Sequence, residues 1–475
     1  MAEIAASERI PLDRSARRVA LIVASAFFIQ HIDGAIINTS LPQMAESFGV
    51  QPVDINIGIT AYLLSMAACI PLGGWVADRF GAKHVFAGAI VIFALASIAC
   101  GLAQTLPQFT AARIVQGVGG ALMAPVGRIV VLRNTEKSSL IDAIALTVWP
   151  ALIAPVIGPL IGGLITTYVS WRANFLINIP LGAALLVLVL SFIPNHRENA
   201  RTPFDAAGFL LTAAALMALL YGLERLALGG EDRLLPSGLI AAGLVIGLLS
   251  VLHMRRHRSP LLDLTTFRIL TFRIATLVGG ITFRLTINAT PFLLPLMLQV
   301  GFGLNPWQAG LYLLIYFGGN LAMKSVTTPM LRKFGFRNVL VGNGLGVAAS
   351  VAACGLLTPS TPSIVIAVVL FVAGLTRSMQ FTCFSTLAFA DIPAEQRSSS
   401  STIFNMFQQL ALGLGVAAAA LVLDASRAGR GASDVGLTDF HIAFFVFGAI
   451  ALVATLVVAR LPRDAGAEVS GHRAG

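Results

Sequence analysis

Residues 30–42 read Gln30-His31-Ile32-Asp33-Gly34-Ala35-Ile36-Ile37-Asn38-Thr39-Ser40-Leu41-Pro42 and close a long apolar run that extends from Val19 to Leu41. A run of this length can cross a lipid bilayer as a helix. A charge inside such a helix costs several kcal/mol and is rare unless it faces a cavity or a partner. Asp33 is therefore a candidate functional residue. The alternative is a structural acid buried against a neighbouring helix.

The composition of the whole chain indicates an all-α integral membrane protein. Of its 475 residues, 56% are hydrophobic and 11% are charged, and the mean hydropathy is +0.84. A soluble domain carries about 25% charged residues. The net charge of +10 comes from Lys and Arg in short loops, which points to contact with the lipid bilayer and not to nucleic-acid binding. The four cysteines fall in apolar runs, so we expect neither disulfides nor a metal site.

Several kinds of activity find no support in the sequence. It contains no Gly-Lys-Ser/Thr phosphate-binding loop, no metal-ligand cluster and no nucleophile elbow. We therefore expect neither an ATP-driven pump nor an enzyme, and no cofactor.

Fourteen apolar segments are long enough to cross a membrane. They cover residues 19–41, 55–77, 84–104, 107–132, 140–166, 172–193, 204–221, 236–254, 273–299, 307–329, 338–357, 363–389, 399–423 and 440–460. Most of the 32 Lys and Arg residues, Arg128 and Arg133 included, fall at the termini or at the hairpin ends that close even-numbered segments. The opposite loops hold only Arg172, Arg225, Arg233, Arg427 and Arg430. Basic loops stay in the cytoplasm, so we expect both termini there.

Two sequence echoes divide the chain into related halves. Leu41-Pro42-Gln43-Met44 and Phe48-Gly49 recur as Leu294-Pro295-Leu296-Met297 and Phe302-Gly303, and Arg79-Phe80-Gly81 is echoed by Lys333-Phe334-Gly335, at an offset of about 254 residues. Repeated halves are typical of secondary transporters, whose substrate site lies between them. We predict a tail (1–18), a six-helix half (19–193), a linker with two inserted helices (194–272), a second six-helix half (273–460) and a cytoplasmic tail (461–475).

In three further stretches, glycine, proline or charged residues stand where a membrane helix needs a physical reason for them. In Gly74-Trp75-Val76-Ala77-Asp78-Arg79-Phe80-Gly81-Ala82-Lys83 the glycines permit a tight turn and close helix approach, and Asp78 is expected near a helix start. Arg113 lies inside an apolar segment and needs an anion or water, unless it snorkels to the outer surface. Pro155-Val156-Ile157-Gly158-Pro159-Leu160-Ile161-Gly162-Gly163 would break a soluble helix but is tolerated in membranes, where small residues allow close packing on the other half.

These motifs together resemble the major facilitator superfamily, and more closely its fourteen-helix drug:proton antiporter branch. The resemblance implies that Asp78 latches the outward-facing state by pairing with Arg128 or Arg133, within a loop that includes Gly74, Arg79, Gly81 and Lys83. It assigns Asp33 and Arg113 to proton coupling. It assigns Pro155, Gly158, Pro159, Gly162 and Gly163 to a motif that marks antiporting exporters. Ala82 and Ala154 depart from the family pattern. A plain basic loop and simple close packing remain the alternatives for the first and last motifs.

Charges within the spans bear on the substrate. The resemblance places Asp33, Arg113, Arg284 and Arg377 on cavity-lining helices, and Lys324 adds another base. One acid against four bases favours an anionic, zwitterionic or neutral amphipathic small molecule over a cationic drug; the alternative is that these bases are structural. The other cavity candidates are Asn38, Gln116, Asn288 and Gln380. His31 lies about 200° around the helix from Asp33, and we interpret it as a packing or interface residue.

The sequence thus predicts a proton-coupled exporter that works by alternating access in a bacterial plasma membrane, as a monomer. The main alternative is a proton-coupled importer of a small metabolite on the same fold. The Gly/Pro pattern of residues 155–163 speaks against this alternative.

Overall fold

The computed structural model describes residues 13–37, 40–50, 52–194, 203–227, 233–432 and 434–471, and all regular structure in these ranges is helical. The prediction of an all-α protein is therefore confirmed. The N-terminal group of helices comprises α1 (Arg14–Ile36), α2 (Leu41–Phe48), η2 (Pro52–Ile55), α3 (Asn56–Cys69), α4 (Leu72–Phe80), α5 (Ala82–Leu102), α6 (Leu106–Arg133), η3 (Lys137–Ser139), α7 (Leu140–Tyr168), α8 (Ala173–Leu176) and α9 (Asn178–Phe192).

Two helices, α10 (Ala206–Ala227) and α11 (Leu234–Arg256), follow this group. The C-terminal group comprises η4 (Leu264–Arg268), α12 (Leu270–Arg273), η5 (Ile274–Val278), α13 (Gly279–Leu296), η6 (Met297–Gly301), α14 (Pro306–Ala322), α15 (Lys324–Cys354), α16 (Ser363–Ala390), η7 (Ala394–Gln396), α17 (Arg397–Gly429), α18 (Leu437–Val458) and α19 (Ala467–Ser470). The η segments are short 3₁₀ or π turns.

Ten helices in the described ranges are long and apolar enough to cross a membrane, or eleven if α3 and α4 form one span bent by 59°. The bend between α3 and α4 lies at Ile70 and Pro71, and proline cannot donate the helical hydrogen bond at this point. In the second group α14 ends at Ala322 and α15 begins at Lys324, with Met323 between them in a helical backbone conformation.

The repeated motifs adopt the same backbone conformation in both groups. Gly49 and Gly303 have φ of +67° and +69°, and Gly81 and Gly335 have φ of +88° and +74°. In each pair the second glycine follows the first by 254 residues. Because residues with a side chain rarely adopt these angles, glycine marks equivalent turns at equivalent places. Gly335 also divides α15 into two helices.

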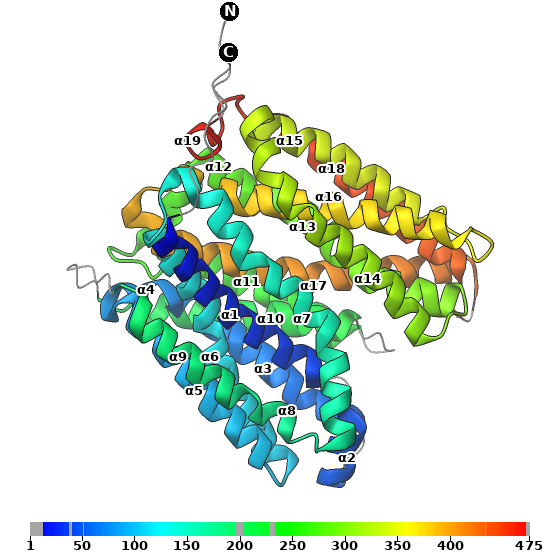
Figure 1. Ribbon diagram of the computed structural model, residues 1–475, viewed down its shortest axis with the longest axis horizontal. Coiled ribbons are helices and arrows are strands. Elements are labelled where there is room, and N and C mark those ends of the chain that lie inside the picture. The colour runs from blue at the N-terminus through cyan, green and yellow to red at the C-terminus, as the bar shows by residue number, and fades with distance from the viewer. Residues whose placement is uncertain are drawn as a thin grey trace, which may run out of the picture.

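The two groups meet at one end of the molecule and diverge toward the other (Figure 1). We call the first end the termini face, because α19 lies there and Arg18, near the start of α1, lies beside Phe192 at the end of α9. At this face α4 and α6 pack on α17, and Thr328 on α15 hydrogen-bonds to Asp142 near the start of α7. Helix α7 also contacts α14 and α16. Helices α10 and α11 pack on each other, and α10 also contacts both α3 and α17.

Candidate functional site

Asp33 and Arg113 form a buried ion pair inside the N-terminal group. Nη1 of Arg113, on α6, donates to Oδ2 of Asp33, on α1, over 2.9 Å, and each side chain is 1% exposed. The guanidinium also lies 4.1 Å from the centre of the Tyr62 ring. Arg113 therefore does not snorkel to a surface. The structure brings together the two residues that the sequence singles out for proton coupling.

Three polar residues complete the shell around this pair. Gln116 Nε2 and Asn178 Nδ2 donate to Asp33 Oδ1 over 2.9 and 2.6 Å. Gln116 also donates to Ser97 Oγ over 2.8 Å, and its Oε1 accepts from Arg113 over 2.6 Å. The prediction that Gln116 lines a substrate cavity is wrong, because its amide is held in this network. Ser97 and Asn178 were missed; the signal that could have found them is a polar side chain well inside an apolar segment, at 84–104 and at 172–193.

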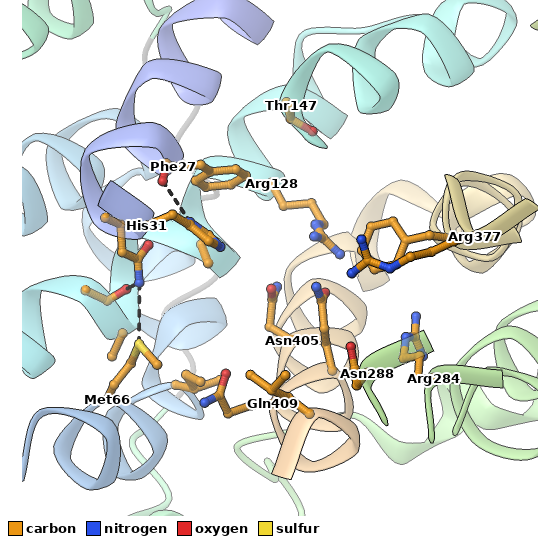
Figure 2. A pocket seen from close by; sticks show the side chains of 18 of the residues that line it. Phe27, His31, Met66, Arg128, Thr147, Arg284, Asn288, Arg377, Asn405 and Gln409 are labelled. Carbon is orange, nitrogen blue, oxygen red and sulfur yellow. Dashed lines mark hydrogen bonds between the residues drawn. The ribbon is translucent and has the colours of Figure 1, made fainter. Parts of the chain in front are cut away.

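A cavity of about 350 Å³ lies between the two groups, close to the ion pair but separate from it. Its walls come from α1, α3, α6 and α7 on one side and from α13 to α17 on the other (Figure 2). The volume is at the lower end of the range of small-molecule sites, roughly 300–1,000 Å³. Gln30 lines the cavity and hydrogen-bonds to Tyr62, which in turn contacts Arg113. A chain of side chains thus joins the cavity to Asp33.

Four of the predicted cavity residues line this space, namely Arg284, Asn288, Lys324 and Arg377. Gln380 does not, although it was predicted to. It is fully buried against α15, where its Oε1 accepts from Asn343 Nδ2 over 2.7 Å and its Nε2 donates to the Leu340 carbonyl over 3.4 Å. Asn38 lies outside the described residues.

Two cavity residues were assigned elsewhere by the sequence. Arg128 was predicted at the end of its helix and as a latch partner. It does lie near the end of α6, but it lines the cavity, with its guanidinium 4.5 Å from the centre of the Phe404 ring. It precedes Arg133 by five residues, which is about 7.5 Å along a helix. His31 was interpreted as a packing or interface residue. Its exposed side chain faces the cavity between the two groups, with Nδ1 2.8 Å from the Phe27 carbonyl (Figure 2).

Asp78 forms a second ion pair, at the termini face. Arg133 Nη2 donates to Asp78 Oδ1 over 2.7 Å and to Ser398 Oγ, on α17, over 3.1 Å, and Ser398 donates to the same carboxylate oxygen. Asp78 lies near the end of α4, so the expected position near a helix start is wrong. Since Ser398 belongs to the C-terminal group, this triad joins the two groups. We call it the latch.

The other residues of the loop motif lie outside the latch triad and have different contacts. A Cβ on Gly74 would lie 3.0 Å from the Ser398 carbonyl oxygen, so glycine allows α4 to approach α17. Gly81 makes the turn from α4 to α5. Lys83 is not in the latch: its Nζ donates to the Leu190 carbonyl over 2.8 Å. Arg79, near the end of α4, is half-buried.

The Gly/Pro motif lies within α7, including Pro155 and Pro159. A Cβ on Gly158 would come within 2.6 Å of Ala35 Cβ, on α1. The expected close packing therefore exists, but at Gly158 it is against a helix of the same group, which corrects the prediction. Gly162 accepts a hydrogen bond from Asn174 through its carbonyl over 3.4 Å, and no atom lies within 4 Å of an added Cβ at Gly163.

Solved structures resemble this fold along nearly its whole length. The human organic anion transporter MFSD10 matches with a TM-score of 0.68 at 14% identity, covering 93% of this chain and 99% of that one. The proton:xylose symporter XylE matches with a TM-score of 0.61 at 15% identity, covering 95% and 97%. At these identities the likeness concerns the fold alone.

Sequence relatives are more similar. Proteins that carry the name multidrug resistance protein MdtD, from Escherichia coli O6:H1 strain CFT073 and from Shigella boydii serotype 18, are 35% identical over 458 residues, which is 95% of this chain and 96% of theirs. The family model described as Major Facilitator Superfamily matches residues 23–416. The chain therefore belongs to the Major Facilitator Superfamily of membrane transporters.

Proposed function

We propose that this transporter exports small amphipathic compounds in exchange for protons, by alternating access in a bacterial plasma membrane. In this proposal the membrane is crossed fourteen times, with both termini in the cytoplasm and two six-helix halves at residues 19–193 and 273–460. The two additional spans are α10 and α11. The protein works as a monomer, without a bound cofactor, and the termini face is its cytoplasmic side.

The observation that carries the proposal is the buried pair of Asp33 and Arg113. The carboxylate accepts hydrogen bonds from Arg113, Gln116 and Asn178, all of the kind that an ionised acid accepts. A proton on Asp33 would remove its charge and leave Arg113 unpaired in a dry setting, which is costly. Protonation therefore favours a rearrangement of α1 against α6, and a single acid can link proton movement to the shape of the group.

Substrate can act on the same pair through the cavity. Gln30 lines the cavity and hydrogen-bonds to Tyr62, and the Tyr62 ring lies against Arg113. A substrate that moves Gln30 thus changes the environment of Arg113 and of the proton site. Substrate and proton occupy different places, so each can favour the departure of the other.

The latch supports a state that is closed on the cytoplasmic side. Asp78 and Arg133 hold Ser398 across the two groups. Thr328 on α15 donates to Asp142 on α7, and Ser401 on α17 donates to the Pro125 carbonyl on α6. Loss of these bonds would open the cytoplasmic side and admit substrate.

Transport by Asp33→Asn in proteoliposomes tests the proposal. Fluorescein, ethidium and a zwitterionic dansyl amino acid serve as anionic, cationic and zwitterionic probes under an imposed pH gradient. Efflux against a concentration gradient should fall at least tenfold for every probe that the wild type concentrates, while downhill movement persists. Glu46→Gln, which neutralises an exposed acid on α2, is the matched control. Undiminished uphill efflux by Asp33→Asn would exclude this residue as the coupling site.

Direction is measured in the same vesicles. Exchange requires that probe and protons move oppositely. Co-movement of probe and protons in the same direction would instead support the importer alternative.

A further inference from the structure

The central cavity collects positive charge without an acid to balance it. Among its described lining residues are Arg128, Arg284, Lys324 and Arg377, and none is Asp or Glu. None of these four forms an ion pair with any described acid. Buried charges in proteins are normally paired, because removing an ion from water is costly. The cavity therefore lacks a counter-charge.

Two of these cations are brought together from opposite halves of the molecule. The guanidinium carbons of Arg128, on α6, and Arg284, on α13, lie 4.5 and 4.6 Å from the centre of the same Phe404 ring. Arginine stays protonated in proteins, so this arrangement cannot be relieved by loss of a proton. Like charges in a setting of low dielectric repel strongly. An anion between them would turn this repulsion into attraction.

The guanidiniums also retain unused hydrogen-bond donors. Buried nitrogens without a described partner include Nη1 of Arg128, Nε and Nη2 of Arg284, and Nε and Nη1 of Arg377. Figure 2 shows Arg128 and Arg377 reaching toward each other from facing walls. Hydrogen bonds within the protein satisfy only one nitrogen of Arg284 and that of Lys324: Arg284 Nη1 donates to the Ala275 carbonyl over 3.3 Å, and Lys324 Nζ donates to Thr382 Oγ1 over 2.6 Å. Unused buried donors are costly and call for acceptors.

We propose that the cavity binds a small organic anion with at least two negatively charged oxygen-bearing groups, held by Arg128, Arg284, Lys324 and Arg377. This inference rests on the proposed export function and names its substrate class. A single negative charge would leave most of the four cations uncompensated. Carboxylate, phosphate and sulfonate oxygens match the paired donors of a guanidinium.

The remaining walls fit the body of such a molecule. Phe27, Met66, Ile70, Phe381 and Leu412 provide apolar contact, and amides from α13 and α17 can bond to further oxygens; these are Asn288, Asn405, Gln408 and Gln409. The ligand is therefore an organic anion and not a bare inorganic ion. Because Arg128 belongs to one group and the other three cations to the second, the anion bridges the two groups.

Binding of a charge series to the full-length protein in detergent tests this. The probes share one ring: benzene-1,3-dicarboxylate, its monomethyl ester, its dimethyl ester and 1,3-bis(aminomethyl)benzene, which carry charges of −2, −1, 0 and +2. By isothermal titration calorimetry the dianion should bind most tightly and the dication should not bind. The preference for the dianion over the other probes should decrease with added salt, which screens charges. Equal binding of all four probes, or tighter binding of the dication, would overturn the proposal.

Variants then test the named residues. Arg284→Gln and Arg377→Gln should each weaken dianion binding by roughly 10- to 100-fold, as expected for a lost charged hydrogen bond. Arg377→Lys should recover part of this loss, since it keeps the charge. Arg256→Gln removes an exposed guanidinium at the end of α11 and is the matched control. Wild-type dianion affinity in both Gln variants would refute the assignment.

A second readout separates a binding role from a structural one. If Arg284 serves the ligand, Arg284→Gln relieves repulsion from Arg128, and the ligand-free protein should unfold at the same temperature as the wild type or higher. A purely structural arginine would instead lower the unfolding temperature, and that result would overturn the proposal even if binding is lost.

Failure of this inference is distinguishable from failure of the proposed function. The binding measurements involve no pH gradient. If uphill transport requires Asp33 but the dianion does not bind, the substrate class is wrong and the export mechanism stands. If the dianion binds and uphill transport ignores Asp33, the substrate class stands and the coupling mechanism is wrong.

Discussion

At the scale of residues, the molecule contains two kinds of buried charge. Arg113 is paired with Asp33 and held by polar neighbours, whereas Arg128, Arg284 and Arg377 keep donors that no described residue satisfies. A buried charge that is paired within the protein has a structural or conformational role. A buried charge without a partner in the protein is costly unless a bound ligand neutralises it. This difference separates the proposed proton site from the proposed substrate site.

The latch gives a prediction at this scale. Asp78→Asn removes the charge that holds Arg133 and Ser398. The state closed at the termini face should therefore lose about 1.5–3 kcal/mol of stability relative to the open state, the range for a hydrogen bond to a charged group. A cysteine at Thr147, which lines the cavity, reports on the change in a variant whose four native cysteines are replaced by serine. Labelling by a maleimide supplied at the termini face should rise several-fold.

Lys83→Gln is the control for the latch experiment. Lys83 belongs to the same sequence motif, but its ammonium donates to the Leu190 carbonyl outside the latch. Labelling should stay at the wild-type level in this variant. A similar rise in Lys83→Gln and Asp78→Asn would show that the whole loop, and not the ion pair, controls opening.

The sequence could identify the charged and polar residues within the spans, but not which neighbouring helix or cavity each side chain faces. Asp33 and Arg113 stand out because each is a lone charge in an apolar run, and their pairing agrees with the expected depth. Gln380 was misplaced because it lies about 60° around α16 from Arg377, enough to turn it from the cavity toward α15. Arg128 was misplaced because, five residues before the end of α6, it lies more than one helical turn from Arg133 and so reaches the cavity and not Asp78.

At the scale of elements, glycines control how closely α1 and α7 approach. Gly158→Ala would place a methyl group 2.6 Å from Ala35 Cβ, and we expect a loss of about 1–3 kcal/mol in the free energy of unfolding from overpacking. Chemical denaturation in mild detergent measures the change. Gly163→Ala, on the same helix but with no atom within 4 Å, should be neutral or slightly stabilising, because alanine favours a helix.

Ala35→Gly supplies the complementary test of this contact. Combined with Gly158→Ala, it should restore most of the lost stability, since the added methyl then has room. If the double variant is no more stable than Gly158→Ala, the loss of stability in Gly158→Ala does not come from the contact between α1 and α7.

Asp205 ties the start of α10 to the end of α11. Burial by itself raises the pKa of Asp205, but hydrogen bonds from the Gly208 N–H, His253 and the Leu261 N–H outweigh this and hold the pKa below its usual value. A lowered pKa means that the ionised acid stabilises the fold above the unfolded value of about 3.9 and ceases to do so as the pH falls through the folded pKa.

The unfolding temperature as a function of pH measures this effect. Asp205→Asn should unfold earlier than the wild type at neutral pH, and the gap should close as the pH falls below about 4. Asp464→Asn, an exposed acid beyond α18, should show no comparable gap at neutral pH. A gap that is independent of pH would mean that charge on Asp205 plays no part.

At the scale of the whole molecule, the sequence predicted the class and the internal repetition well. Helical membrane architecture follows from composition, and the paired turns at Gly49 and Gly303 and at Gly81 and Gly335 follow from the two echoes. The number of spans is harder to predict, because some apolar segments are broken. The 59° bend after Cys69 is a feature of the backbone that hydropathy does not record.

The position of α10 has a consequence for how the two groups of helices can move apart. It packs on both α3 and α17, with Leu220 against Gly413 and Thr60 bonded to Glu224, and so covers the seam between the two groups on that flank. The opposite flank, where α7 faces α14, carries no such cover from the inserted pair. On that flank the two groups can part by separating α7 from α14 and α16 alone, whereas on the α10 side a helix of the inserted pair would have to move as well.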